Sequence, residues 1–152
     1  MTVPRMRRLL ALAVVSAVAA TGASAASDPR LVAAVKVVRS KGYRVDSTRT
    51  WEPSAPLNAL IGTFAKSADG YNKRAFFFYR GRYLGTDSSA PSAQISELWS
   101  DDRTVALLYV LYRGSDPLCC PTGGGKIVRF RWNGRRLVAL DRIPPLSGSL
   151  HR

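Results

Sequence analysis

Apolar and polar positions alternate at helical spacing between residues 28 and 42. Four apolar residues fall on one face of this segment: Leu31, Ala34, Val35 and Val38. Asp28 can cap the amino end, Pro29 suits the first helical position, and Gly42 can adopt the left-handed conformation that ends a helix. The pattern therefore predicts one α-helix, which we expect to lie on a β-sheet with its valine face inward.

Short strands separated by turn residues follow from residue 43 onward, as is typical of an antiparallel sheet. Residues 43–48 and 57–65 predict single strands. Three hairpins then pair residues 73–79 with 82–86, 94–99 with 104–112, and 126–132 with 135–141. Their turns contain Arg80-Gly81, Asp101-Asp102 and Asn133-Gly134. The last turn gives the strongest signal, because Asn-Gly supplies the positive φ that a type I′ turn needs at both central residues.

The Asn133-Gly134 turn also predicts a register. A two-residue turn places Trp132 opposite Arg135 and Arg131 opposite Arg136. Four residues then point inward: Val128, Phe130, Leu137 and Ala139. The opposite face gathers three arginines: Arg129, Arg131 and Arg136. Since opposed like charges destabilise a strand pair, we expect this face to meet water or an anion.

Two segments are apolar on both faces and predict central strands. Residues 105–112 have the sequence V-A-L-L-Y-V-L-Y, and residues 74–79 have the sequence R-A-F-F-F-Y. A strand of this kind needs a cover on both sides, and we expect the helix to cover one face of residues 105–112. The elements together predict an α+β fold, with one N-terminal helix packed on an antiparallel β-sheet built largely from hairpins.

The two ends of the chain predict segments outside the folded domain. Residues 1–25 combine a basic head, an apolar run and small residues at the end, which predicts a secretory signal peptide cleaved after Ala25. The alternative is an uncleaved membrane anchor, which needs about 20 apolar residues. The run from Leu9 to Ala20 is shorter. We expect a single globular domain over residues 26–145, a flexible tail over residues 146–152, and no transmembrane segment in the mature chain.

The sequence is strongly basic. It contains 23 Lys and Arg against 10 Asp and Glu, a formal net charge of +13. Cleavage after Ala25 removes three arginines and no acidic residue, which leaves +10. Such a charge favours contact with anionic polymers or a membrane surface. Solubility explains it more simply, because no block of five or six like charges occurs, and we expect no specific nucleic-acid partner.

Most enzyme templates fail on the inventory of side chains. The sole histidine, His151, lies in the predicted tail, so a Ser-His-Asp, Cys-His or zinc arrangement has no dependable base or ligand. Residues 123–126 (G-G-G-K) lack the spacing of a phosphate loop. Glu52 and Glu97 leave a two-carboxylate glycosidase open, although the aspartates have ordinary roles in caps and turns. We therefore favour a role without catalytic residues, metal or cofactor.

Cys119 and Cys120 are the only cysteines, and they lie side by side in a loop rich in Gly and Pro. Neighbouring Cα atoms lie about 3.8 Å apart whereas a disulfide normally spans about 4.4 to 6.8 Å, so a bond between them must distort the peptide. Oxidising surroundings favour bonded cysteines. A vicinal disulfide, a bridge to another chain, and free or metal-bound thiols all stay open. Because such loops display binding residues, we take Cys119, Cys120 and Asp116 as candidates.

Six sequence blocks carry a resemblance to a known family. They are L-N-A-L-I-G at 57–62, S-A-D-G-Y-N-K-R-A-F-F-F at 67–78, G-R-Y-L-G-T-D at 81–87, D-P-L-C-C-P-T-G-G at 116–124, V-R-F-R-W-N-G at 128–134 and I-P-P at 143–145. In this order they resemble the LppP/LprE family of exported actinobacterial lipoproteins. The resemblance implies an envelope location and brings no catalytic residues with it. The predicted signal has no lipid-acceptor cysteine, so we expect a secreted or envelope-associated protein that is not lipid-anchored.

Three hypotheses about function follow, in order of preference. The first is a binding or interaction module for an envelope ligand or protein, which displays the Cys119-Cys120-Pro121 loop and a turn formed by Thr86, Asp87 and Ser88. The second is a thiol/disulfide redox protein or small enzyme that uses the two cysteines. The third is a charge-driven binder of anionic envelope polymers through four arginines: Arg129, Arg131, Arg135 and Arg136.

Overall fold

The computed structural model describes residues 28–144, so the predicted signal peptide over residues 1–25, the predicted tail over residues 146–152 and His151 lie outside the described residues. One helix, α1, spans Pro29–Ser40. Eight strands follow it: β1 (Tyr43–Val45), β2 (Leu57–Phe64), β3 (Lys73–Tyr79), β4 (Arg82–Thr86), β5 (Gln94–Ser100), β6 (Thr104–Val110), β7 (Gly125–Trp132) and β8 (Leu137–Ala139). No helix between residues 28 and 144 is long and apolar enough to cross a membrane.

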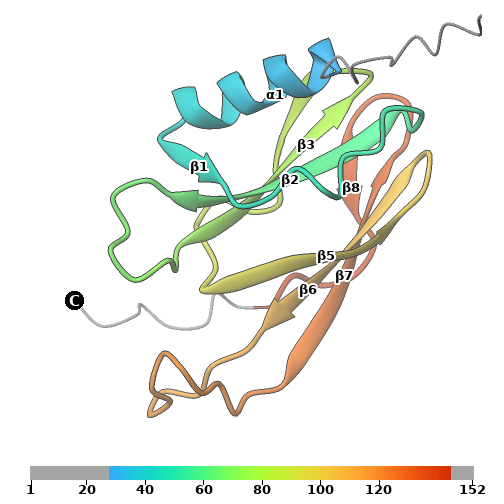
Figure 1. Ribbon diagram of the computed structural model, residues 1–152. Helices are drawn as coiled ribbons and strands as arrows, with labels where there is room; N and C mark the ends of the chain where they lie inside the picture. Colours follow the sequence, from blue (N-terminus) through green and yellow to red (C-terminus); the bar gives the residue numbers. More distant parts are fainter. Residues whose placement is uncertain (1–27, 145–152) are drawn as a thin grey trace, which may run out of the picture.

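The strands form two antiparallel sheets that stack face to face. The first has the order β1-β2-β3-β4 and the second the order β5-β6-β7-β8. In Figure 1, α1 lies over the outer face of the first sheet and the second sheet lies below it, so the molecule has three layers. The α+β class and the antiparallel pairing are confirmed. The strands, however, divide between two sheets, whereas the sequence predicted one.

A core of aliphatic and aromatic side chains fills the space between the two sheets. Its members come from alternate positions of the strands, because successive side chains of a strand point to opposite faces. They are Leu57, Ala59, Ile61, Ala75, Phe77, Ile95, Val105, Leu107, Tyr109, Val128, Phe130 and Trp132. The rings of Phe77 and Phe130 meet across the sheets with centroids 5.0 Å apart. Burial of these side chains holds the layers together.

A second core lies between α1 and the outer face of the first sheet. It contains Ala34, Val38, Tyr43, Trp51, Leu60, Phe76 and Phe78. The helix comes close to β2 at Gly62, where an added Cβ would lie 3.1 Å from Val38 Cγ1. The prediction that the helix covers residues 105–112 is therefore wrong, because α1 packs on β2 and β3. Residues 74–79 and residues 105–112 are both apolar on two faces, so the hydrophobic period does not indicate which of these strands the helix covers.

The ends of α1 follow the sequence signals. The Asp28 side chain accepts a hydrogen bond from the Arg30 amide at 2.9 Å, and Pro29 occupies the first helical position. Gly42 follows the helix with a φ of +82°, in the left-handed region that glycine tolerates without strain. Local chemistry thus fixes where this helix begins and ends.

All three predicted hairpins form, pairing β3 with β4, β5 with β6, and β7 with β8. The first turn uses positive φ at both central residues, +50° at Arg80 and +82° at Gly81. The pairing of β3 with β4 shifts register between Phe77 and Phe78, which leaves Leu84 as an extra residue in β4. The bulge turns Leu84 toward the core between the sheets, while its neighbour Tyr83 packs on the helix side.

The predicted register of the last hairpin is wrong by two residues. Trp132 pairs with Leu137 and Arg131 with Val138, so Arg131 and Arg136 are not opposed. The turn centres on Gly134-Arg135 because the Asn133 side chain accepts hydrogen bonds from the two following arginine amides, each at 2.9 Å. A shift of two residues preserves the faces, so the expected inward residues still line one side of this hairpin.

Candidate functional site

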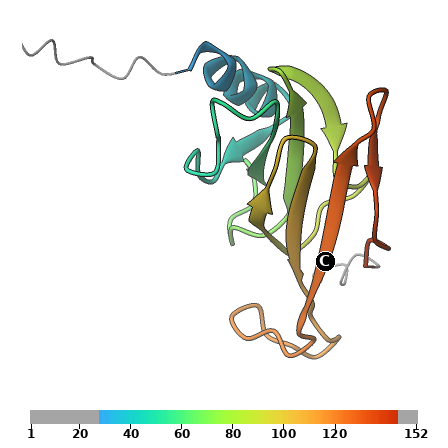
Figure 2. The ribbon, with the colours of Figure 1, turned by 90° about the vertical axis from the view of Figure 1, so that its right-hand side faces the viewer.

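The two cysteines lie in the long connection between β6 and β7, which projects from the body of the molecule and is drawn in orange at the bottom of Figures 1 and 2. Its base is closed by two backbone hydrogen bonds, from Leu111 to Gly124 at 2.8 Å and from Gly123 to Leu111 at 2.9 Å. An added Cβ at Gly123 would lie 2.4 Å from the Leu111 carbonyl oxygen, so the close approach requires glycine there. The base of the loop is therefore tightly joined.

Asp116 organises the interior of this loop. Its carboxylate accepts hydrogen bonds from the Arg113 amide, the Thr122 amide and the Thr122 hydroxyl, each at 2.7 Å. These bonds to the Thr122 side chain and backbone hold the pKa of the carboxyl below its ordinary value. Asp116 thus acts as an internal tie of the loop.

Two tyrosines anchor the loop to the body. The hydroxyls of Tyr71 and Tyr112 both donate to the Leu118 carbonyl oxygen, and their rings meet edge to face with centroids 6.1 Å apart. Burial, followed by the hydrogen bond with Tyr71, raises the pKa of Tyr112 to about 12. Tyr71 lies between β2 and β3, so this contact ties the loop of the second sheet to the first sheet.

Cys119 and Cys120 are free thiols in the structure, and both are exposed. The neighbouring Cys119 side chain, followed by a smaller effect of desolvation, raises the pKa of the Cys120 thiol. A raised pKa lowers the thiolate fraction of Cys120. The vicinal disulfide stays a prediction. No group of three or more His, Cys, Asp or Glu suited to a metal ion occurs within residues 28–144.

The Thr86 to Ser88 turn differs from the displayed turn that the sequence indicated. Asp87 is only 5% exposed. Its carboxylate accepts a hydrogen bond from the Ala75 amide at 2.9 Å and another from the Tyr109 hydroxyl at 2.7 Å. Since β3 contains Ala75 and β6 contains Tyr109, Asp87 links the two sheets. Thr86 and Ser88 are half-buried, and the Thr86 hydroxyl donates to the Ser88 carbonyl oxygen.

A pocket of about 410 Å³ opens between β4, the edge strand of the first sheet, and the β7–β8 hairpin of the second. Figure 2 shows these edges side by side. Three arginines line it, namely Arg82, Arg135 and Arg136, together with apolar Leu84, Phe130, Leu137 and Ile143, and with Thr86 and Asp87. The Arg82 guanidinium lies 5.8 Å from the ring centroid of Trp132, which stacks on Tyr79. This volume is within the range of small-ligand pockets.

The four arginines predicted as one anionic-polymer surface separate into two groups. Arg135 and Arg136 line the pocket, whereas Arg129 pairs with Asp141 at 2.8 Å on the outer side of β7. The hydrogen bonds from Arg129 lower the pKa of Asp141 to about 2. Arg131 is exposed opposite Thr104 and Val138. The binding of anionic envelope polymers through these four arginines stays a prediction.

The structure thus unites Thr86 and Asp87 with Arg135 and Arg136 in one pocket, and it leaves the cysteine loop apart from them. Sequence reasoning missed Arg82 and its contact with Trp132. The only local signal was the place of Arg82 directly after the Arg80-Gly81 turn, which says nothing about a hairpin fifty residues further along the chain.

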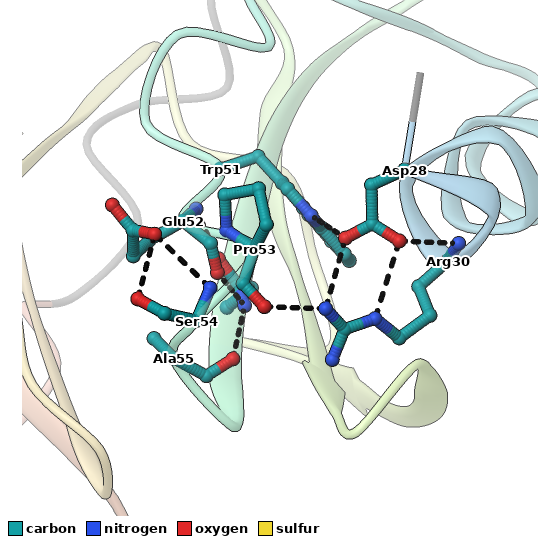
Figure 3. Close-up of polar contacts among 8 residues, drawn as sticks. Asp28, Arg30, Trp51, Glu52, Pro53, Ser54 and Ala55 are labelled. Atoms are coloured by element: carbon teal, nitrogen blue, oxygen red, sulfur yellow. Dashed lines mark hydrogen bonds and ion pairs between the residues drawn. The ribbon is translucent and has the colours of Figure 1, made fainter. Parts of the chain in front are cut away.

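A further polar cluster joins the start of α1 to the connection before β2 (Figure 3). The Asp28 carboxylate accepts hydrogen bonds from Trp51 Nε1 at 3.0 Å and from the Arg30 guanidinium, and these bonds lower its pKa. Arg30 also donates to the Pro53 carbonyl oxygen. The Asn58 side chain accepts a hydrogen bond from the Glu52 amide and donates one to the Glu52 carbonyl oxygen. Each of these groups has its partner inside the cluster, so we interpret the cluster as a structural contact that holds the start of α1 against the connection before β2.

Comparison with known proteins gives a consistent family assignment. The model of the LppP/LprE lipoprotein family matches residues 49–135, which include the cysteine loop and most of the pocket. Lipoprotein LppP of Mycobacterium tuberculosis and its counterpart in Mycobacterium bovis are each 31% identical to the chain over 125 residues, which covers 81% of this chain and 70% of theirs. No solved structure matches the chain.

Proposed function

Because the chain belongs to the LppP/LprE lipoprotein family, we propose that it is a cell-envelope domain that binds a partner through its Cys119-Cys120 loop without catalysing a reaction. The predicted signal peptide over residues 1–25 supports export. The chain has no cysteine before Cys119, so the segment around Ala25 offers no thiol for a lipid. We therefore place the mature chain in the envelope or outside the cell without a lipid anchor.

The observation that carries this proposal is the construction of the loop. It is held from inside by Asp116 and from the body by Tyr71 and Tyr112, yet it leaves both thiols exposed. A preorganised loop loses less conformational entropy when it meets a partner.

The location and the state of the cysteines can be tested by intact mass. We expect full-length protein expressed in an actinobacterial host to be recovered as residues 26–152, without added lipid. Alkylation with and without reductant then separates three states of Cys119 and Cys120: a vicinal bond, a bridge to another chain, and free thiols. A lipid adduct, or a mass that retains residues 1–25, would contradict the proposed location.

The binding role can be tested with a matched pair of loop variants. The full chain, a Cys119→Ser/Cys120→Ser variant and a Ser115→Ala variant are immobilised and exposed to the same envelope fraction. Ser115 is exposed in the same loop, so its substitution controls for general changes at this surface. We expect the wild type and the Ser115 variant to retain the same component and the double cysteine variant to lose it. Equal retention by all three proteins would refute the role of the thiols.

A second candidate, a thiol/disulfide protein, is favoured by the two free, exposed thiols of Cys119 and Cys120, which are neighbours in the sequence. Two-electron oxidation of this pair by an external disulfide would form one S–S bond and release the other disulfide as two thiols. A redox titration of the purified chain against glutathione decides this candidate. A pair that never cycles over the glutathione range eliminates it, without affecting the binding proposal.

A further inference from the structure

The pocket between β4 and the β7–β8 hairpin has an unequal distribution of charge along its length. Arg82 begins β4, and Arg135 and Arg136 occupy the tip of the hairpin, beside Trp132. Asp87 lies beyond the far end of β4. A strand rises about 3.3 Å per residue, so the four steps from Arg82 to Thr86 span roughly 13 Å, and Asp87 follows Thr86. The pocket thus has a cationic end and an acidic end.

The arginines at this end have no carboxylate partner in the part of the chain that the structure describes. The ion pairs within residues 28–144 involve Arg30, Lys73 and Arg129, and none involves a pocket arginine. The three arginines are exposed and line one pocket, so an anion bound there would be attracted by all three guanidinium groups. Guanidinium groups also match carboxylate and phosphate in geometry, because they donate two parallel hydrogen bonds.

The middle of the pocket is apolar. Leu84, Leu137 and Ile143 are half-buried there, between the cationic end and Asp87. The bulge in β4 turns Leu84 inward, and Gly85 beside it leaves open space where a Cβ would stand. Half-buried aliphatic side chains in a concave site gain from being covered by an apolar ligand surface.

We propose that this pocket binds a small amphiphilic anion, with its carboxylate or phosphate between the arginines and its aliphatic body over Leu84, Leu137 and Ile143. The Asp87 carboxylate does not oppose this orientation, because the anionic group lies at the other end and both Asp87 oxygens already accept hydrogen bonds. The ligand is either a free organic anion or the head region of a lipid, since both present the same chemistry. The pocket is separate from the cysteine loop, so a negative result for the pocket does not affect the proposal that the loop binds a partner, and the reverse also holds.

The test is an NMR titration of the full chain with four probes: octyl phosphate, octanoate, inorganic phosphate and neutral octanol. We expect the two amphiphilic anions to shift the amide signals of residues 83–86 and 137–139. Inorganic phosphate and octanol should each bind at least about tenfold more weakly, because each lacks one half of the recognition. Shifts confined to other regions, or no binding of either amphiphile, would overturn the proposal. Equal affinity for inorganic phosphate would overturn the apolar part of it.

A pair of charge-matched variants distinguishes the pocket from general attraction. Arg82→Gln/Arg136→Gln removes two pocket charges, whereas Arg44→Gln/Arg131→Gln removes two exposed charges outside the pocket lining. We expect the dissociation constant of octyl phosphate to rise about tenfold or more in the first variant and to change less than about twofold in the second. Equal weakening in both, with unchanged circular dichroism, would show that only net charge matters and would refute the site.

Vesicles containing phosphatidylglycerol separate the two sources of the ligand. If octyl phosphate displaces the chain from such vesicles, the pocket takes a lipid head region. If the chain binds octyl phosphate and ignores the vesicles, the ligand is a free anion. Vesicle binding without any binding of octyl phosphate would place the interaction outside the pocket and contradict the proposal.

Discussion

Replacement of Asp87 tests how the two sheets are joined. Its carboxylate accepts hydrogen bonds from the Ala75 amide in β3 and the Tyr109 hydroxyl in β6, and the residue is 5% exposed. Asp87→Ala leaves both donors buried without an acceptor. Each such donor costs about 1 to 3 kcal/mol, partly offset by the removal of a buried carboxylate, so we expect a net loss of roughly 2 to 4 kcal/mol in the free energy of unfolding.

Asp87→Asn removes the titratable carboxyl. It also replaces one of the two accepting oxygens by an NH2 donor, so only the pH dependence of the stability difference reports on the charge. Burial raises the pKa of Asp87 above its ordinary value of 3.8, and the hydrogen bonds from Tyr109 and Ala75 only partly oppose this shift. For a carboxyl whose pKa is raised on folding, the associated stability is complete below the unfolded pKa and is lost as pH rises through the folded pKa. Asparagine has no such titration. The wild type should therefore lose stability relative to Asp87→Asn as pH rises above the ordinary pKa of 3.8 and through the raised pKa of the folded state.

The assay is urea unfolding of both proteins, followed by tryptophan fluorescence at several pH values. Because the other carboxyl groups are common to both proteins, their titrations cancel in the difference between the two free energies. Tyr109→Phe serves as a control, since it removes the hydroxyl donor but keeps the ring in the core. A difference between wild type and Asp87→Asn that is constant, or that grows in favour of the wild type with rising pH, would refute this account of Asp87.

Two further predictions concern packing and acid stability. Gly62→Val should lower the free energy of unfolding by about 1 to 3 kcal/mol, because an added Cβ there lies 3.1 Å from Val38 Cγ1 of α1. As a control, Gly114→Ala should change it by less than about 0.5 kcal/mol, because an added Cβ there has no neighbour within 4 Å. Equal urea midpoints for the two variants would contradict this prediction. Asp141→Asn should remove stability that the wild type has above the ordinary pKa of 3.8 and loses as pH falls through the folded pKa of about 2, because Arg129 stabilises the carboxylate. Acid titrations that coincide for the two proteins would show that this pair contributes nothing.

The sequence by itself determined the local elements. Asp28 caps the helix, which begins at Pro29 and ends before Gly42, because caps depend on neighbouring residues alone. The three expected strand pairs form as hairpins, and the first two keep their expected turns. Alternation along β7 also determined which residues point inward. The exact register of the last hairpin was not determined, because Asn133 has two ways to support a turn and its side-chain hydrogen bonds select one.

Only the tertiary structure decided how these elements combine. An apolar face indicates that a strand is covered, but the spacing of its apolar residues does not indicate which element covers it. The sequence therefore allowed α1 to pack on residues 74–79 or on residues 105–112. The same limit applies to the candidate site. Arg82 begins β4 of the first sheet and Arg136 directly precedes β8 of the second, and the two line one pocket only because the folded sheets bring these edge strands together. The sequence predicted Asp87 as a turn residue. Its hydrogen-bond partner Tyr109 lies 22 residues further along the chain, so local sequence did not indicate that Asp87 is buried.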